Sequence, residues 1–165
     1  MTTFSEPFDQ RTLRTFYGQI PSGVLALGAV VDGAPVGMAV SSFTNVSLDP
    51  PLMVVSIRNE SATWPLIARA DAIGASILAE SQGDCGTRLA AGESDSRFDS
   101  IGYTVTASGA IVVDDAAAWF EATLSETIPA GDHFLVLLTL RSISNGVDRS
   151  PLLFFRSKFA AVHDA

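Results

Sequence analysis

From residue 23 onward the chain alternates short β-prone runs with clusters of turn-forming residues. This pattern restricts the possible folds more than any other feature of the sequence. Asp32-Gly33 is a strong hairpin signal, and Asp49-Pro50-Pro51 makes a stiff corner. Between Trp119 and Ile128, apolar and polar residues alternate as they do in a strand with one buried face. Such a series of short strands predicts a mainly β protein.

The same pattern gives residue ranges for the expected elements. We expect strands over residues 24–31, 36–48, 52–57, 73–79, 103–113, 119–128, 134–143 and 152–159. Apolar residues at helical spacing predict helices over 7–20 and 64–70, with a weaker one over 82–91. Many short strands and few helices favour a closed or nearly closed antiparallel barrel, because closure removes exposed strand edges. No repeat or linker interrupts the pattern, so we expect residues 1–165 to form a single domain.

The composition excludes several classes of function. The formal net charge of −8 disfavours binding to nucleic-acid phosphates or to an anionic membrane surface. Cys85 is the only cysteine and the chain has two histidines, so we expect neither an intramolecular disulfide nor a Cys/His metal site. The sequence shows no cationic signal segment and no apolar run of ~18 residues, which predicts a cytoplasmic protein without a membrane span.

Common catalytic motifs are absent. The sequence contains neither G-x-G-x-x-G opening a helix nor G-x-x-x-x-G-K-[ST]. Asp132 and His133 make a poor Ser-His-Asp relay, because neighbouring residues on a strand point to opposite faces. Cys85 follows the acidic Asp84 and has no assignable base, which disfavours a reactive thiolate.

The most polar stretch inside otherwise apolar sequence spans residues 37–51. It begins at Gly37, carries several hydroxyl groups and ends in the double-proline corner. Glycine lets another group approach the backbone closely, and each buried hydroxyl needs a hydrogen-bond partner. Hydroxyls and free amides on a stiff loop suit a phosphate, or the carbonyl and ring-nitrogen edge of a flavin.

Blocks spread along the chain occur in the order and spacing of a known family. They are Pro21-Ser22-Gly23-Val24, Gly37-Met38-Ala39-Val40-Ser41-Ser42-Phe43, Ser47-Leu48-Asp49-Pro50-Pro51, Leu78-Ala79-Glu80-Ser81-Gln82, Arg97-Phe98, Gly131-Asp132-His133 and Pro151-Leu152-Leu153-Phe154-Phe155-Arg156. Over about residues 10–160 the chain therefore resembles the flavin reductase-like domain of the FMN-binding split-barrel superfamily.

The resemblance implies a mainly β fold, a split antiparallel β-barrel with Greek-key character and a few short flanking helices. It also implies a homodimer whose interface helps to shape the flavin sites. Enzymes of this kind take a hydride from NADH or NADPH onto FMN or FAD, and many supply the reduced flavin to a separate monooxygenase. The sequence leaves both cofactor choices open, because no residue that reads the nucleotide ribose can be placed.

The site residues follow from the resemblance by position. The walls around the isoalloxazine and the ribityl chain would be Gly37, Met38, Ala39, Val40, Ser41, Ser42, Phe43, Thr44, Ser47 and Leu48. The flavin phosphate would lie near Ser61, Thr63 and Trp64, and the pocket would be completed by Ala79 and Gln82. The catalytic residue would be His133, facing the ring, with Phe155 and Arg156 near the nicotinamide nucleotide. Arg97 and Phe98 would either close over the flavin or serve only in packing.

Two alternatives remain. The chain could be a flavin- or haem-binding module without turnover, such as a carrier or a sensor. An oxidase of the related pyridoxamine-phosphate type would need several basic residues at the substrate phosphate, and the ten Lys and Arg residues are thinly spread.

Overall fold

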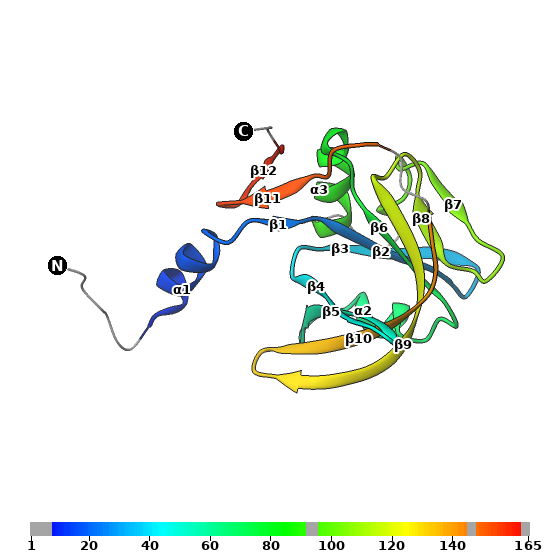
Figure 1. Ribbon diagram of the computed structural model, residues 1–165, viewed down its shortest axis with the longest axis horizontal. Helices are drawn as coiled ribbons and strands as arrows, with labels where there is room; N and C mark the ends of the chain where they lie inside the picture. Colours follow the sequence, from blue (N-terminus) through cyan, green and yellow to red (C-terminus); the bar gives the residue numbers. More distant parts are fainter. Residues whose placement is uncertain (1–7, 92–95, 145–147, 163–165) are drawn as a thin grey trace.

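The structure is a computed structural model that describes residues 8–91, 96–144 and 148–162. Its body is an antiparallel sheet of seven strands in the order β3-β2-β6-β9-β10-β5-β4. These strands are β2 (Leu25–Val31), β3 (Ala34–Val40), β4 (Phe43–Leu48), β5 (Pro51–Arg58), β6 (Ile73–Ile77), β9 (Ala118–Ala130) and β10 (His133–Ile143). The sheet curves around its own core, and β9 and β10 form a long bent hairpin along one side (Figure 1). The expectation of a mainly β, barrel-like fold is therefore confirmed.

Smaller elements surround this sheet. A three-stranded sheet joins β1 (Ser22–Gly23), β11 (Leu153–Phe155) and β12 (Lys158–Ala160), and a hairpin joins β7 (Tyr103–Val105) to β8 (Ile111–Val113). The helices are α1 (Gln10–Tyr17), α2 (Trp64–Ile67) and α3 (Gly83–Ala91), the last preceded by a 3-10 turn, η1 (Glu80–Gln82). Helix α3 packs against β2 and β3, and α2 buries Trp64 and Ile67 in the core.

Three of the expected strands were wrong in extent, because each is two strands joined by a turn. The range 36–48 divides into β3 and β4 at Ser41-Ser42, where the Ser42 carbonyl accepts a hydrogen bond from the Ser56 amide. The range 103–113 divides into β7 and β8, and the range 152–159 divides into β11 and β12. Arg156 and Ser157 turn the last pair with φ of 50° and 60°. Only one of the three turns contains the glycine or proline that a pattern search uses.

The two helices expected nearest the N-terminus are shorter than their ranges. α1 begins after Asp9, whose carboxylate accepts a hydrogen bond from the Thr12 amide at 2.6 Å, and it ends before Gly18. α2 has four residues instead of seven, so its macrodipole is small. Pro7 lies outside the described residues, as does Asn145-Gly146, which the sequence predicts to separate the last two expected strands.

The apolar residues form two clusters on opposite faces of the sheet. Leu25, Leu27 and Ala29 of β2 point into the cluster inside the barrel, whereas Ala26 points into a cluster beneath α3 and β8. Both faces of β2 are therefore buried, which explains why its sequence is continuously apolar instead of alternating. Helix α3 also packs against β3, the edge strand of this sheet.

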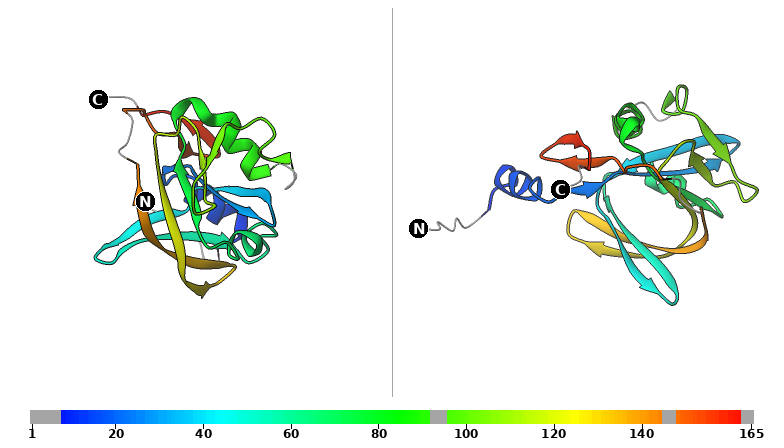
Figure 2. Two further views of the ribbon diagram at one scale, coloured as in Figure 1. Left: turned by 90° about the vertical axis from the view of Figure 1, so that its right-hand side faces the viewer. Right: turned by 45° about the horizontal axis from the view of Figure 1, so that its top comes forward.

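Helix α1 projects from the body of the molecule (Figures 1 and 2). It buries none of its residues, and Phe16 and Tyr17 are exposed. Across the described ranges, no helix has both the length and the apolar character needed to cross a bilayer.

Candidate functional site

A cleft of about 450 Å³ opens where the end of β3, the end of β5 and α3 meet. The strand ends and the loops after them supply most of its lining. The residues that line it are Met38, Ala39, Val40, Ser41, Ser42, Ser56, Ile57, Arg58, Glu60, Ser61, Ala62, Thr63, Leu89, Ala90, Arg97 and His133. The lining thus combines hydroxyl groups and two arginines with apolar residues.

Strand register brings His133 to the cleft. His133 is paired with Arg58 across the β10–β5 ladder, so both side chains leave the sheet on the same face. The turns beyond the two strands are also joined: the Asn59 amide donates to the Asp132 carbonyl at 3.0 Å, and its side chain donates to the Gly131 carbonyl at 3.1 Å. These bonds fix the histidine relative to the wall formed by β5.

The His133 imidazole is oriented by its neighbour. Its Nδ1 lies 2.7 Å from a carboxylate oxygen of Asp132, and this hydrogen bond lowers the pKa of Asp132 below its usual value. Because an ionised carboxylate only accepts hydrogen bonds, Nδ1 carries the proton and Nε2 is the nitrogen left for other contacts. Asp132 lies in the turn before β10. The alternation of neighbouring strand residues, from which we expected a poor relay, therefore does not keep its side chain away from His133.

The Arg97 side chain extends from the segment after α3 to residues of β3 and of the segment before α2. Its Nη1 donates to the Gly37 carbonyl and to the Thr63 hydroxyl, both at 2.9 Å. The ring of Phe98 fills the space beside Gly37, where a Cβ would lie 2.6 Å from the Phe98 Cζ. The side of Gly37 from which a flavin ring was expected to approach is therefore occupied by the protein's own aromatic ring.

The cleft gathers about half of the residues expected from the sequence. It includes Met38, Ala39, Val40, Ser41, Ser42, Ser61, Thr63 and His133. The expected residues outside its lining are Gly37, Phe43, Thr44, Ser47, Leu48, Trp64, Ala79, Gln82, Phe155 and Arg156. Among these, Trp64 is buried in the core, and Leu48 is 95% exposed at the edge strand.

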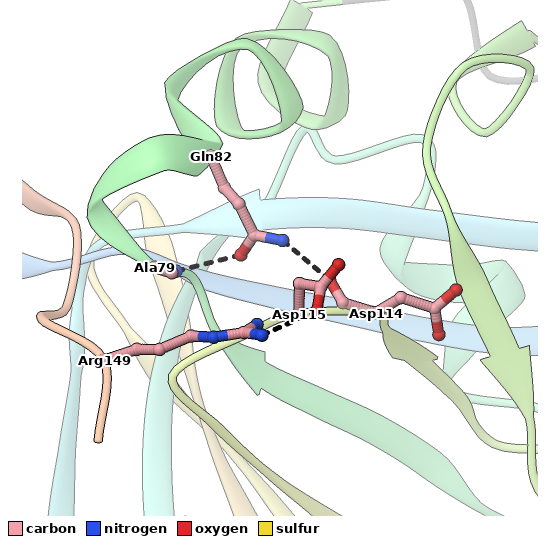
Figure 3. A network of polar contacts seen from close by, with 5 residues as sticks. All are labelled: Ala79, Gln82, Asp114, Asp115 and Arg149. Atoms are coloured by element: carbon pink, nitrogen blue, oxygen red, sulfur yellow. Dashed lines mark hydrogen bonds and ion pairs between the residues drawn. The ribbon is translucent and has the colours of Figure 1, made fainter. Parts of the chain in front are cut away.

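Gln82 has a structural role on another side of the molecule. Its side-chain oxygen accepts from the Ala79 amide at 2.9 Å, and its nitrogen donates to the Asp114 carbonyl at 2.7 Å. Figure 3 shows this bridge beside the ion pair of Arg149 with Asp115, at 2.7 Å. Ala79 and Gln82 therefore fasten the start of α3 to the loop after β8.

Arg156 binds the N-terminal part of the chain instead of the cleft. Its Nε and Nη2 donate to the Gln19 side-chain oxygen at 2.9 and 2.7 Å, and its guanidinium lies 5.0 Å from the centre of the Phe155 ring. The turn at Arg156 sends this side chain toward Gln19, beyond α1. The β11–β12 hairpin thus anchors α1.

The remaining residues of the cleft were missed by sequence reasoning. They are Ser56, Ile57, Arg58, Glu60, Ala62, Leu89 and Ala90. Of these residues, only Arg58 and Glu60 could have been suspected from the sequence, because the polar run Arg58-Asn59-Glu60 follows directly on an apolar strand. Among the residues that the structure describes, no group of three His, Cys, Asp or Glu side chains could hold a metal ion.

Cys85 lies in a separate cavity beside α3, together with Gln82 and Arg88. Burial raises the pKa of its thiol from 9.0 to about 11. Since only the thiolate reacts, a shift of this size lowers the reactive fraction at pH 8 by about 100-fold. We expect iodoacetamide to alkylate the folded protein far more slowly than the urea-unfolded protein, and equal rates would contradict the burial of this thiol.

Comparisons with known proteins agree with this geometry. Residues 17–163 match the sequence model of a family described as "Flavin reductase like domain". The chain is 34% identical over 152 residues to a flavin reductase of Pseudomonas putida, covering 92% of this chain and 89% of that protein. It is 31% identical over 160 residues to the flavin-dependent monooxygenase reductase subunit HsaB of Mycobacterium tuberculosis, covering 96% and 85%.

A solved structure shows the same fold. The NADH:FAD oxidoreductase SgcE6 of Streptomyces globisporus, in complex with NAD and FAD fragments, superposes with a TM-score of 0.89. The identity is 26%, and the alignment covers 98% of each chain. The expected split-barrel fold class is confirmed by this likeness.

Proposed function

The chain belongs to the family of flavin reductase-like domains, and on this premise we propose that it is an NAD(P)H:flavin oxidoreductase that supplies reduced FMN or FAD to a partner monooxygenase. One observation carries the proposal for this chain's own residues. The hydroxyl-bearing end of β3, two arginines and His133 come from distant parts of the sequence and line one cleft. Residues 1–165 are proposed to act as one domain in the cytoplasm.

The cleft fits a flavin nucleotide in size and chemistry. Its volume of about 450 Å³ lies within the range of about 300–1,000 Å³ that is usual for cofactor sites. Met38, Ala39 and Ala90 are the accessible apolar residues of the lining against which a planar ring could lie, and hydroxyl groups line the cleft beside them. Among the described residues of the lining, Arg58 and Arg97 are cationic and Glu60 is anionic, so cationic groups for an anion are present although the chain carries a net charge of −8.

The residues of the cleft act by binding and alignment. Hydride transfer is the chemistry that a flavin and a nicotinamide supply when both are bound. Met38 to Ser42 would form the wall beside the ring, and Ser61 and Thr63 would contact the phosphate end. This division follows the positions that the family resemblance gives to these residues.

His133 is proposed to orient the nicotinamide at the open side of the cleft. Its side chain is 32% exposed, so it can contact a second ligand that arrives from solvent. Asp132 holds the ring so that Nε2 is the nitrogen available to that ligand. Alignment of this kind does not require a strong acid or base.

We also propose that the protein is a homodimer. Phe16, Tyr17 and Ile20 are exposed at and after α1, and Val46 and Leu48 are exposed on β4. Exposed apolar side chains grouped on a projecting helix and an edge strand are typical of association surfaces. Sedimentation should give twice the chain mass of 17.3 kDa, and a monomer at micromolar concentration would contradict this assembly.

An activity assay tests the proposed reaction. Purified protein is mixed with NADH or NADPH and with FMN or FAD, and the loss of nicotinamide absorbance is followed. The likeness to an NADH:FAD oxidoreductase makes NADH with FAD the pair to test first. We expect oxidation that depends on added flavin. A protein that binds flavin but oxidises neither nucleotide would instead be a flavin-binding module without turnover.

A further inference from the structure

Thr63 stands at the start of α2, yet its hydroxyl does not cap the helix. The Trp64 amide instead donates to the Ser61 hydroxyl at 3.1 Å. The Thr63 hydroxyl accepts a hydrogen bond from Arg97 at 2.9 Å, and Thr63 is only 6% exposed. A buried residue at a capping position thus directs its hydroxyl toward a cation across the cleft.

This hydrogen bond determines which further hydrogen bonds the Thr63 hydroxyl can make. A threonine hydroxyl has one hydrogen to donate and two lone pairs to accept with. Because Arg97 has no acceptor atom, the hydrogen bond between them must use a lone pair of Thr63, and the hydroxyl hydrogen stays available for another acceptor. A cation on the accepting side polarises the O–H bond and makes it a stronger donor.

Among the residues that the structure describes, Arg97 is the cation that donates a hydrogen bond to the Thr63 hydroxyl. α2 has four residues and the amide at its first position is already bonded to Ser61, so a helix N-terminus contributes little. Arg58, the second arginine of the lining, lies on the exposed end of β5. Arg97 is thus the cation that is bonded to the Thr63 hydroxyl, and an anion that binds this hydroxyl would lie near its charge.

We propose that Arg97 is a positioning residue for the flavin phosphate, which it recognises by orienting and polarising the Thr63 hydroxyl. This inference rests on the proposed function and adds to it the residue that distinguishes a flavin nucleotide from the unphosphorylated riboflavin. The bond from Arg97 to the Gly37 carbonyl holds the guanidinium in place from the β3 side. The same side chain therefore connects the phosphate end of the cleft to the wall beside the ring.

The test compares ligands that differ only in the phosphate. FMN and riboflavin are titrated into the full chain, and flavin fluorescence gives the two dissociation constants. We expect Arg97→Gln to weaken FMN binding by about 10-fold or more, since a charge-assisted hydrogen bond is lost, while riboflavin binding changes by less than about 2-fold. Thr63→Val should give the same pattern, Thr63→Ser should retain phosphate selectivity, and Arg97→Lys should restore part of it.

A double mutant and a charge control complete the design. If the two side chains act as one unit, Arg97→Gln with Thr63→Val should lose no more FMN affinity than the single variants. Arg88→Gln changes the net charge equally, but Arg88 is exposed in the separate cavity that contains Cys85, so FMN binding should be unchanged. Thr63→Val leaves the Arg97–Gly37 bond intact and keeps the test valid if Arg97→Gln folds poorly.

Two results would overturn the proposal, and they are distinguishable. Equal losses for FMN and riboflavin in both variants, with flavin reduction retained in the wild type, would mean that Arg97 and Thr63 only shape the wall. A wild-type protein that binds neither flavin and oxidises no nucleotide would reject the proposed function and this inference together.

Discussion

A Gly37→Ala variant should have a free energy of unfolding about 3 kcal/mol below that of the wild type. The added Cβ would lie 2.6 Å from the Phe98 Cζ and 2.7 Å from the Leu27 carbonyl oxygen. A rotation of Phe98 can relieve the first contact. The second is with backbone, because Gly37 pairs with Gly28 in the β2–β3 ladder, next to Leu27, so the two strands must shift. Flavin affinity should fall as well, since Arg97 binds the Gly37 carbonyl and moves with it.

Chemical denaturation measures the first effect, and fluorescence titration with FMN measures the second. Gly83→Ala is the matched control, because its Cβ would lie 3.3 Å from the ring of Phe159, which is exposed and can move. Gly83 begins a helix, where alanine is favoured, so we expect a change of less than about 1 kcal/mol. A Gly37→Ala protein as stable as the wild type would show that the Phe98 ring does not occupy the place assigned to it.

A His133→Ala variant should lose about 10- to 100-fold in kcat/KM for the nicotinamide nucleotide, the size of effect that misalignment of a reactant produces. The dissociation constant of the flavin should change by less than about 3-fold, because one hydrogen bond at most is affected. The reason for the difference is position. His133 lies at the turn between β9 and β10 and is partly exposed, whereas the hydroxyl groups and Arg97 lie on the other walls.

Steady-state kinetics with varied NADH and NADPH, combined with flavin titration, separates the two effects. Asp132→Asn keeps an oxygen that can accept from the His133 Nδ1 but removes the charge, so its loss should be smaller than that of His133→Ala. Parallel losses of flavin binding and nucleotide use in His133→Ala would show that the histidine belongs to the flavin wall and not to the nucleotide.

Much of the fold could be predicted because its strands follow simple rules. β2, β5, β9 and β10 are apolar or alternating runs that end at turn residues, and they were found within a few residues of their bounds. The turns at Ser41-Ser42 and Arg156-Ser157 were missed because neither contains glycine or proline. Their conformations depend on contacts with Ser56 and with Gly18, which lie far away in the sequence.

Part of the candidate site could likewise be predicted from the sequence, and part of it could not. Residues 38–42 and His133 were found because they belong to local sequence blocks that resemble a family. Arg58 was missed because only the register of β10 against β5 brings it beside His133. Gln82 and Arg156 lie in similar blocks, but their side chains point to Asp114 and Gln19, and a sequence block does not reveal side-chain direction.

A crystal structure of the protein soaked with FMN or FAD tests the flavin site most directly. The isoalloxazine should lie against Met38 to Ser42, with a phosphate oxygen within hydrogen-bonding distance of the Thr63 hydroxyl and the open face of the ring toward His133. Flavin density at another surface, or a cleft that stays filled by the protein's own side chains at saturating flavin, would contradict the assignment.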